Sequence, residues 1–179
     1  MKTLIVIDMQ NDFISGALAN AEAEKTVAKT VSLVSKWEGE IIFTRDTHGD
    51  NYIQTEEGKN LPVPHCIKDT DGWQIRKEIY DAALKNKKAT VKTVDKPSFG
   101  AGTLLYKAVI SDEVPEKITF TGTCTDICVI SNALILKSFL TETPMSVIED
   151  LCSGVTAEKH RAAIDVMQSC QIAVEHYRD

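Results

Sequence analysis

Three side chains capable of nucleophilic or acid–base chemistry stand at the ends of apolar segments in this sequence. Asp8 directly follows the apolar run 4–7, Lys96 follows the alternating segment 90–94, and Cys128 follows the segment 117–121 after a short turn. A thiol is a strong nucleophile once it loses its proton, a carboxylate can accept that proton, and an ammonium group favours the charged form of an acidic neighbour. These residue types suit a covalent hydrolytic reaction.

The stretch 120–136 holds two cysteines, Cys124 and Cys128, and Cys128 is the better placed to react. Thr125 or Asp126 is a natural N-cap residue, so Cys128 is predicted in the first turn of a helix. A helix N-terminus lowers the pKa of a thiol and favours the thiolate. Cys124 lies before the cap, where its backbone N–H matters more than its sulfur. Both cysteines also fit as small core residues, the usual place of a free cysteine.

The acid and the lysine each have a structural alternative. Asp8 could cap the turn of the segment DMQND, and Lys96 could be a solvated loop lysine. Lys92 is a second candidate lysine, but Lys96 stands at the C-terminal end of its predicted strand. Because ligands of parallel sheets bind beyond that end, Lys96 is preferred over Lys92.

A second set of residues suits a metal ion. Asp46 and His48 form a D-x-H motif after the segment 40–44, and His65 follows within a polar loop from residue 45 to about residue 72. One carboxylate and two imidazoles fit a divalent transition metal that keeps positions open for water or substrate. Zinc is expected first, with manganese or iron as alternatives. The competing interpretation is a solvated surface loop.

Strand and helix patterns alternate along the chain, and this alternation brings the candidate residues together. The predicted strands are 3–8, 40–44, 90–94, 117–121, 145–149 and 171–177. Strands that alternate with helices predict an α/β fold: a doubly wound, mostly parallel six-stranded sheet with helices on both faces, as in Rossmann-like proteins. All the candidate groups then fall at one edge of the sheet.

Length, charge and cysteine content narrow the class of protein. The 179 residues fit one domain, 1–179, and the net charge of −6 argues against nucleic acid or an anionic membrane as a partner. The apolar run of four residues near the N-terminus is too short for a signal peptide or a membrane span, which favours a cytoplasmic location. Five cysteines without a C-x-x-C motif favour reduced thiols. The expected partner is a small-molecule substrate, and assembly into a homo-oligomer is left open.

Five motifs taken together resemble the isochorismatase-like cysteine hydrolases, and among them the nicotinamidase-related amidases. The motifs are LIVIDMQNDF, FTRDTH, PHCIKDTDGW, DKPSFGAGTL and TGTCTDICVISNAL, and the similarity runs from about residue 3 to the C-terminus. The resemblance implies a triad of Asp8, Lys96 and Cys128, with Cys128 as the nucleophile. It also implies a cis peptide just after Thr123 and an oxyanion hole formed by the N–H groups of Cys124 and Cys128.

The resemblance also implies a metal held by Asp46, His48 and His65, and it places Phe13 against the substrate ring. The implied reaction is hydrolysis of a small amide, nicotinamide or a related ring amide, to an acid and ammonia. Two segments depart from the nicotinamidase pattern: NLPVPHC lacks the aromatic residue before the histidine, and KPSFG is a shortened Y-S-x-F motif. The alternatives are an isochorismatase or an N-carbamoyl amidohydrolase of the same superfamily, and a non-catalytic binding module. The metal residues favour the amidase over the isochorismatase, and the complete triad argues against the binding module.

Overall fold

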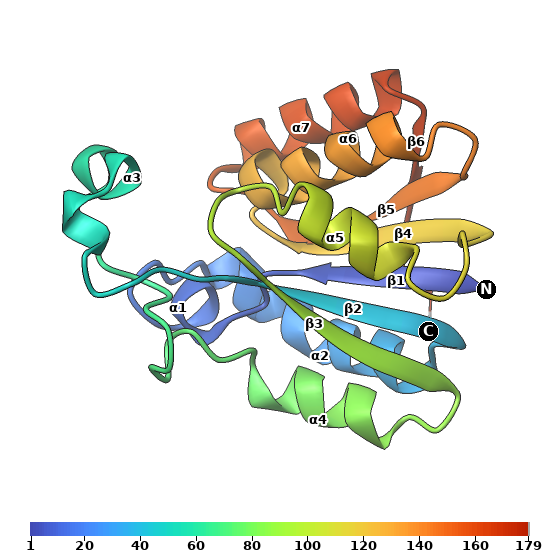
Figure 1. Cartoon of the computed structure of the whole chain (residues 1–179), viewed down its shortest axis with the longest axis horizontal. Helices are drawn as coiled ribbons and strands as arrows, with labels where there is room; N and C mark the ends of the chain where they lie inside the picture. The colour runs from blue at the N-terminus through green and yellow to red at the C-terminus, as the bar shows by residue number, and fades with distance from the viewer. Residues whose placement is uncertain (179) are drawn as a thin grey trace.

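One six-stranded sheet runs through the described part of the chain, residues 1–178 of the computed structural model (Figure 1). The strand order is β3-β2-β1-β4-β5-β6, and every neighbouring pair is parallel. The strands are β1 Lys2–Ile7, β2 Gly39–Asp46, β3 Ala89–Lys96, β4 Lys117–Thr123, β5 Met145–Ser153 and β6 Ile172–Glu175. The expected doubly wound parallel sheet is confirmed.

Helices cover both faces of this sheet because the strands are apolar on both sides (Figure 1). Leu4 and Val6 pack on one face with α2 (Ala21–Lys36) and α4 (Lys77–Lys85). Ile5 and Ile7 pack on the other face with α5 (Thr103–Val109), α6 (Ile130–Phe139) and α7 (Ala157–Ser169). Successive residues of β1 therefore belong to two separate cores, as the two-residue period of a strand requires. No helix within residues 1–178 is both long and apolar enough to cross a membrane.

Two strands extend further than the apolar pattern predicts, and this changes the position of two candidate residues. Asp46 and Lys96 were expected just after their strands, but they are the last residues of β2 and β3 and lie opposite each other in the parallel register. Both side chains are buried. These polar residues can end buried strands because the Lys96 ammonium pairs with the Asp46 carboxylate at 3.3 Å.

The segment between β2 and α4 is more ordered than the polar loop expected from the sequence. It contains the 3₁₀ turn η1 (Tyr52–Gln54) and the short helix α3 (Glu56–Asn60), which stand out from the C-terminal edge of the sheet (Figure 1). Thr55 caps α3 by accepting the N–H of Gly58 at 3.0 Å. Tyr52 is 1% exposed and its hydroxyl donates to the carbonyl of Leu61 at 2.9 Å. The short helix α1 (Asn11–Ile14) follows β1 at the same edge.

Candidate active site

Three buried groups meet at the C-terminal edge of the sheet. Lys96 Nζ lies 2.7 Å from Asp8 Oδ2 and 3.6 Å from Cys128 Sγ. Asp8 and Lys96 are 0% exposed and Cys128 is 5% exposed. Lys92, the alternative lysine, instead pairs with Glu40 and, at 2.7 Å, with Asp112. The structure therefore brings Lys96, and not Lys92, to the thiol.

The carboxylate of Asp8 is fixed from two directions. Asp8 follows the last residue of β1 with a φ of +46°, a left-handed conformation that aspartate tolerates better than most residues. Thr44 in the neighbouring strand β2 donates its hydroxyl to Asp8 Oδ1 at 2.6 Å and accepts the N–H of Asp8 at 3.2 Å. Thr44 was not singled out from the sequence, because a threonine inside a strand pattern carries no signal beyond its β-propensity. The carboxylate of Asp8 binds Thr44 and Lys96, so Asp8 does not serve merely as a cap of the turn that follows β1.

Burial sets the protonation of the triad. Burial, together with the charge of Asp8, raises the pKa of the Cys128 thiol well above its usual value, and Lys96 opposes that shift. This is opposite in direction to the lowering that a helix N-terminus was expected to give. Burial likewise raises the pKa of Asp8, with Lys96 again opposing. A neutral thiol beside a carboxylate of increased basicity suits proton transfer from sulfur to oxygen during attack.

Cys128 lies in a π-helical turn, η2 (Thr125–Val129), that precedes α6. The carbonyl of Cys124 accepts the N–H groups of Ile127 and Val129, each at 3.1 Å, and no side chain caps the turn. The predicted capping by Thr125 or Asp126 is therefore wrong. Such turns occur frequently at functional sites.

Thr125 and Asp126, which were expected to cap η2, form hydrogen bonds with α7 and with Val155, the residue before the N-cap of α7. The Thr125 hydroxyl is hydrogen-bonded to His160 Nδ1 at 2.8 Å, and Asp126 Oδ1 accepts the N–H of Val155 at 2.9 Å. The peptide bond between Thr123 and Cys124 is cis, as the resemblance implies. The turn that carries Cys128 is thus tied to a helix from the far end of the chain.

A second cluster, the metal-binding group, lies beside the triad. It consists of Asp46, His48, Glu57 and His65, and one ligand atom of each lies within 4.8 Å of all the others. Asp46 Oδ2 is 2.9 Å from His48 Nε2 and 3.5 Å from His65 Nε2. Glu57 Oε1 is 3.7 Å from both imidazole nitrogens. The three residues predicted from the sequence are brought together, and Glu57 is a fourth that sequence reasoning missed.

This group has the chemistry and the geometry that a divalent transition metal needs. Two imidazole nitrogens and two carboxylates match the ligands that zinc prefers, and ligand atoms around a tetrahedral zinc lie roughly 3.3 Å apart. His65 Nδ1 lies 2.9 Å from the carbonyl of Val63, which fixes the N–H there and leaves Nε2 free to bind a metal. Lys96 also lies 3.3 Å from Asp46 Oδ1, so one ammonium contacts both clusters. The residues present therefore fit a bound metal.

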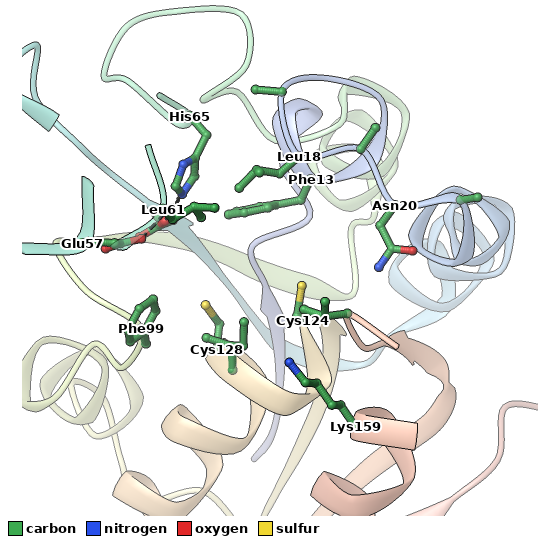
Figure 2. Close-up of a pocket in the computed structure, with 16 residues that line it drawn as sticks. Phe13, Leu18, Asn20, Glu57, Leu61, His65, Phe99, Cys124, Cys128 and Lys159 are labelled. Atoms are coloured by element: carbon green, nitrogen blue, oxygen red, sulfur yellow. Dashed lines mark ion pairs between the residues drawn. The ribbon is translucent and has the colours of Figure 1, made fainter. Parts of the chain in front are cut away.

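A cavity of about 610 Å³ opens over the thiol (Figure 2). Cys128 and Cys124 line it, together with Asp46, Glu57 and His65 from the metal-binding group. Most other lining residues are apolar: Phe13, Ala17, Leu18, Ala19, Ala21, Leu61, Phe99, Ile127 and Val155. The ring of Phe13 packs edge-on against His65, with centroids 5.6 Å apart. A small apolar or aromatic molecule can reach the thiol and the metal-binding group at the same time.

Sequence comparisons relate the chain to a known family. The profile of the isochorismatase domain matches residues 2–176. The chain is 32% identical to the nicotinamidase of Saccharomyces cerevisiae over 126 residues, which are 54% of this chain and 56% of that protein. The chain thus spans about half the length of this relative. It is 25% identical to the nicotinamidase/pyrazinamidase of Mycobacterium tuberculosis over 96% of this chain and 97% of that protein.

Solved structures share the fold over nearly the whole chain. The pyrazinamidase of Pyrococcus horikoshii in complex with zinc superposes with a TM-score of 0.78 at 25% identity, covering 98% of this chain and 99% of that one. The yeast nicotinamidase bound to the inhibitor nicotinaldehyde superposes with a TM-score of 0.82 at 22% identity, covering 99% and 100%. At 22% identity, this second likeness is one of fold.

Proposed function

Because this chain belongs to the isochorismatase family, we propose that it hydrolyses a small amide to a carboxylic acid and ammonia through a thioester on Cys128. The observation that carries the proposal is the buried contact of Asp8, Lys96 and Cys128 beneath a mostly apolar cavity. The relationship to proteins named as nicotinamidases supports an amide as the substrate. Nicotinamide or a related ring amide is the proposed substrate class, with the ring against Phe13.

The first half of the reaction forms the thioester. Asp8 accepts the proton of Cys128 as the sulfur attacks the amide carbonyl carbon, because both pKa values are raised and the proton has a basic acceptor. The N–H groups of Cys124 and Cys128 stabilise the oxyanion, and one such donor typically lowers the barrier by about 3 kcal/mol. Asp8 then passes the proton to the leaving nitrogen, and ammonia departs.

The second half of the reaction returns the thiol. Asp8 accepts a proton from a water molecule, and the hydroxyl adds to the thioester carbonyl. Cleavage of the C–S bond releases the carboxylic acid, and the sulfur takes back its proton. Lys96 keeps its own proton throughout, because Asp8, Cys128 and Asp46 raise its pKa against the opposing effect of burial.

Asp46, His48, Glu57 and His65 are the residues that would hold a divalent metal, with zinc the first expectation. A metal in this position supplies Lewis acidity that orients a substrate atom or a water molecule. The group lies on the cavity wall and contacts Lys96 through Asp46.

The test of this function is ammonia release from a panel of amides, with and without a chelator. The panel includes nicotinamide, pyrazinamide, benzamide and N-carbamoyl amino acids. We expect turnover of at least one primary amide by the wild type and none by Cys128→Ala, while Cys152→Ala, which removes another buried thiol, remains active. Absence of turnover across the panel with zinc or manganese added, or a fully active Cys128→Ala variant, would refute the proposal.

A further inference from the structure

The cavity over the thiol carries charged groups on two sides. Asp46, Glu57 and His65 of the metal-binding group line one side. In the view of Figure 2, Glu57 lies to one side of Cys128 and Lys159 of α7 lies to the other, with its amine directed toward the cysteines. Lys159 is the one lysine or arginine among the described residues that line this cavity.

Lys159 is an exposed residue that lines the cavity, and its ammonium group is without a counter-ion within residues 1–178. Within residues 1–178, no carboxylate forms an ion pair with its Nζ, whereas Lys92 and Lys96 each pair with two carboxylates. The other lining residues on its side of the cavity, Cys124, Ile127 and Val155, bring no formal negative charge. Lys159 is exposed, so water weakens its field, but an unpaired cation beside the apolar part of the cavity wall still creates a positive potential that attracts an anionic ligand. Nicotinamide, which is neutral, would leave this cation unpaired.

The position of Lys159 relative to the nucleophile is fixed by hydrogen bonds. Lys159 is in the first turn of α7, and its N–H donates to the capping hydroxyl of Thr156 at 3.1 Å. Val155, four residues before Lys159, and His160, directly after it, bind the side chains of η2, the turn that carries Cys128, at 2.9 Å and 2.8 Å. The backbone of Lys159 is therefore held at a defined place beside the turn that carries the sulfur, and its long side chain reaches into the cavity from there.

We propose that Lys159 determines substrate specificity and that the preferred substrates are amides that also carry a carboxylate. The carboxylate pairs with the Lys159 ammonium while the amide carbonyl lies over Cys128. This inference rests on the proposed amide hydrolysis for its turnover consequences, but the attraction of anions to the cavity is independent of that reaction. The residue acts on substrate binding, so its replacement changes KM more than kcat.

The first experiment compares matched amides. The substrates are 3- and 4-carbamoylbenzoate and their nitrobenzamide counterparts, in which a neutral nitro group replaces the carboxylate at the same size. We expect Lys159→Gln to raise KM for at least one carbamoylbenzoate about three- to fivefold, the range of a partly exposed ion pair, with kcat and the nitro compounds unaffected. Lys159→Glu should raise it further. Arg161→Gln, which removes the same charge from another exposed residue of α7 that does not line the cavity, is the control and should change nothing.

The second experiment needs no turnover. Alkylation of Cys128 by anionic iodoacetate and by neutral iodoacetamide is followed by mass spectrometry of the Cys128 peptide at one pH. We expect the ratio of the two rates to fall about three- to fivefold in Lys159→Gln, and further in Lys159→Glu, but not in Arg161→Gln. A ratio that is the same in all variants overturns the role of Lys159. If no amide is hydrolysed but the ratio falls as expected, the proposed function fails while the anion-attracting role of Lys159 stands.

Discussion

Removing the charge of Lys96 is the sharpest test of the triad. Lys96→Met keeps most of the side-chain volume but leaves Asp8 and Asp46 without their ammonium partner. Coulomb's law at an effective dielectric constant of about 20 gives about 6 kcal/mol for unit charges 2.7 Å apart, before the cost of burying the ions is subtracted. Burial raises the pKa of Asp8, and Lys96 lowers it. Without Lys96, Asp8 should therefore be protonated at neutral pH.

A protonated Asp8 cannot accept the proton of Cys128. General-base catalysis typically contributes about 10²- to 10⁴-fold, so we expect kcat/KM for the best amide to fall at least about 100-fold at pH 7. The raised pKa of Asp8 gives the sign of the pH dependence: activity of the variant should rise as pH increases and deprotonates Asp8. In the wild type Lys96 opposes that shift, so the corresponding rise should lie at lower pH than in the variant. Ammonia release measured from pH 6 to pH 9 gives both profiles.

Lys92→Met is the matched control, because it also leaves a buried carboxylate, Glu40 at 1% exposure, without its ammonium partner. Breaking a buried ion pair typically costs about 3–5 kcal/mol of folding stability, so both variants should unfold at lower urea concentration. Only Lys96→Met should show the large fall in kcat/KM. If Lys96→Met does not fold, Lys96→Gln, a polar variant that also removes the charge, allows the comparison. A folded Lys96 variant without the ammonium that retains kcat/KM within tenfold of the wild type, or an equal rate loss in Lys92→Met, would refute the reasoning.

Three further predictions concern the thiol, the base and the metal-binding group. Cys128→Ala should lose turnover but keep the wild-type circular dichroism spectrum. Measurable release of ammonia by that variant would contradict the assigned nucleophile. Thr44→Val removes the hydrogen bond from Thr44 to Asp8 Oδ1, at 2.6 Å. A hydrogen bond to a charged group is typically worth about 1.5–3 kcal/mol, so kcat/KM should fall about tenfold. An unchanged rate would show that Thr44 does not position the base. Glu57→Gln should weaken zinc binding about 10- to 100-fold by competition with a fluorescent chelator, a typical loss for an altered metal site. Burial lowers the pKa of His65, but its hydrogen bonds to Asp46 and Val63 raise it overall. Zinc should therefore be lost as pH falls, and the loss should begin at a higher pH than for an unperturbed histidine. Zinc content in Glu57→Gln equal to the wild type, or independent of pH, would exclude this ligand set.

Local patterns in the sequence were sufficient for the sheet and for placing Asp8, Lys96 and the Asp46–His48 motif at one of its edges. Continuous apolar runs such as 4–7 mark strands buried on both faces, and alternation with helical segments makes those strands parallel. In a parallel sheet the carboxyl ends of all strands lie at one edge, so polar residues after different strands must meet there. Asp8, Lys96 and the Asp46–His48 motif could be placed by this reasoning alone.

Other features depended on which distant segments pack together, and no local pattern reports that. Glu57 joins the metal-binding group because η1 and α3 fold back over the edge of the sheet, and one acid in a polar segment carries no periodic signal. Lys159 reaches the cavity because α7 is bonded to the turn that carries Cys128. The pKa of that thiol was predicted in the wrong direction for the same reason. A helix N-terminus acts over one turn of local chain, whereas desolvation is set by every layer packed over the sulfur, and only the tertiary structure brings those layers together.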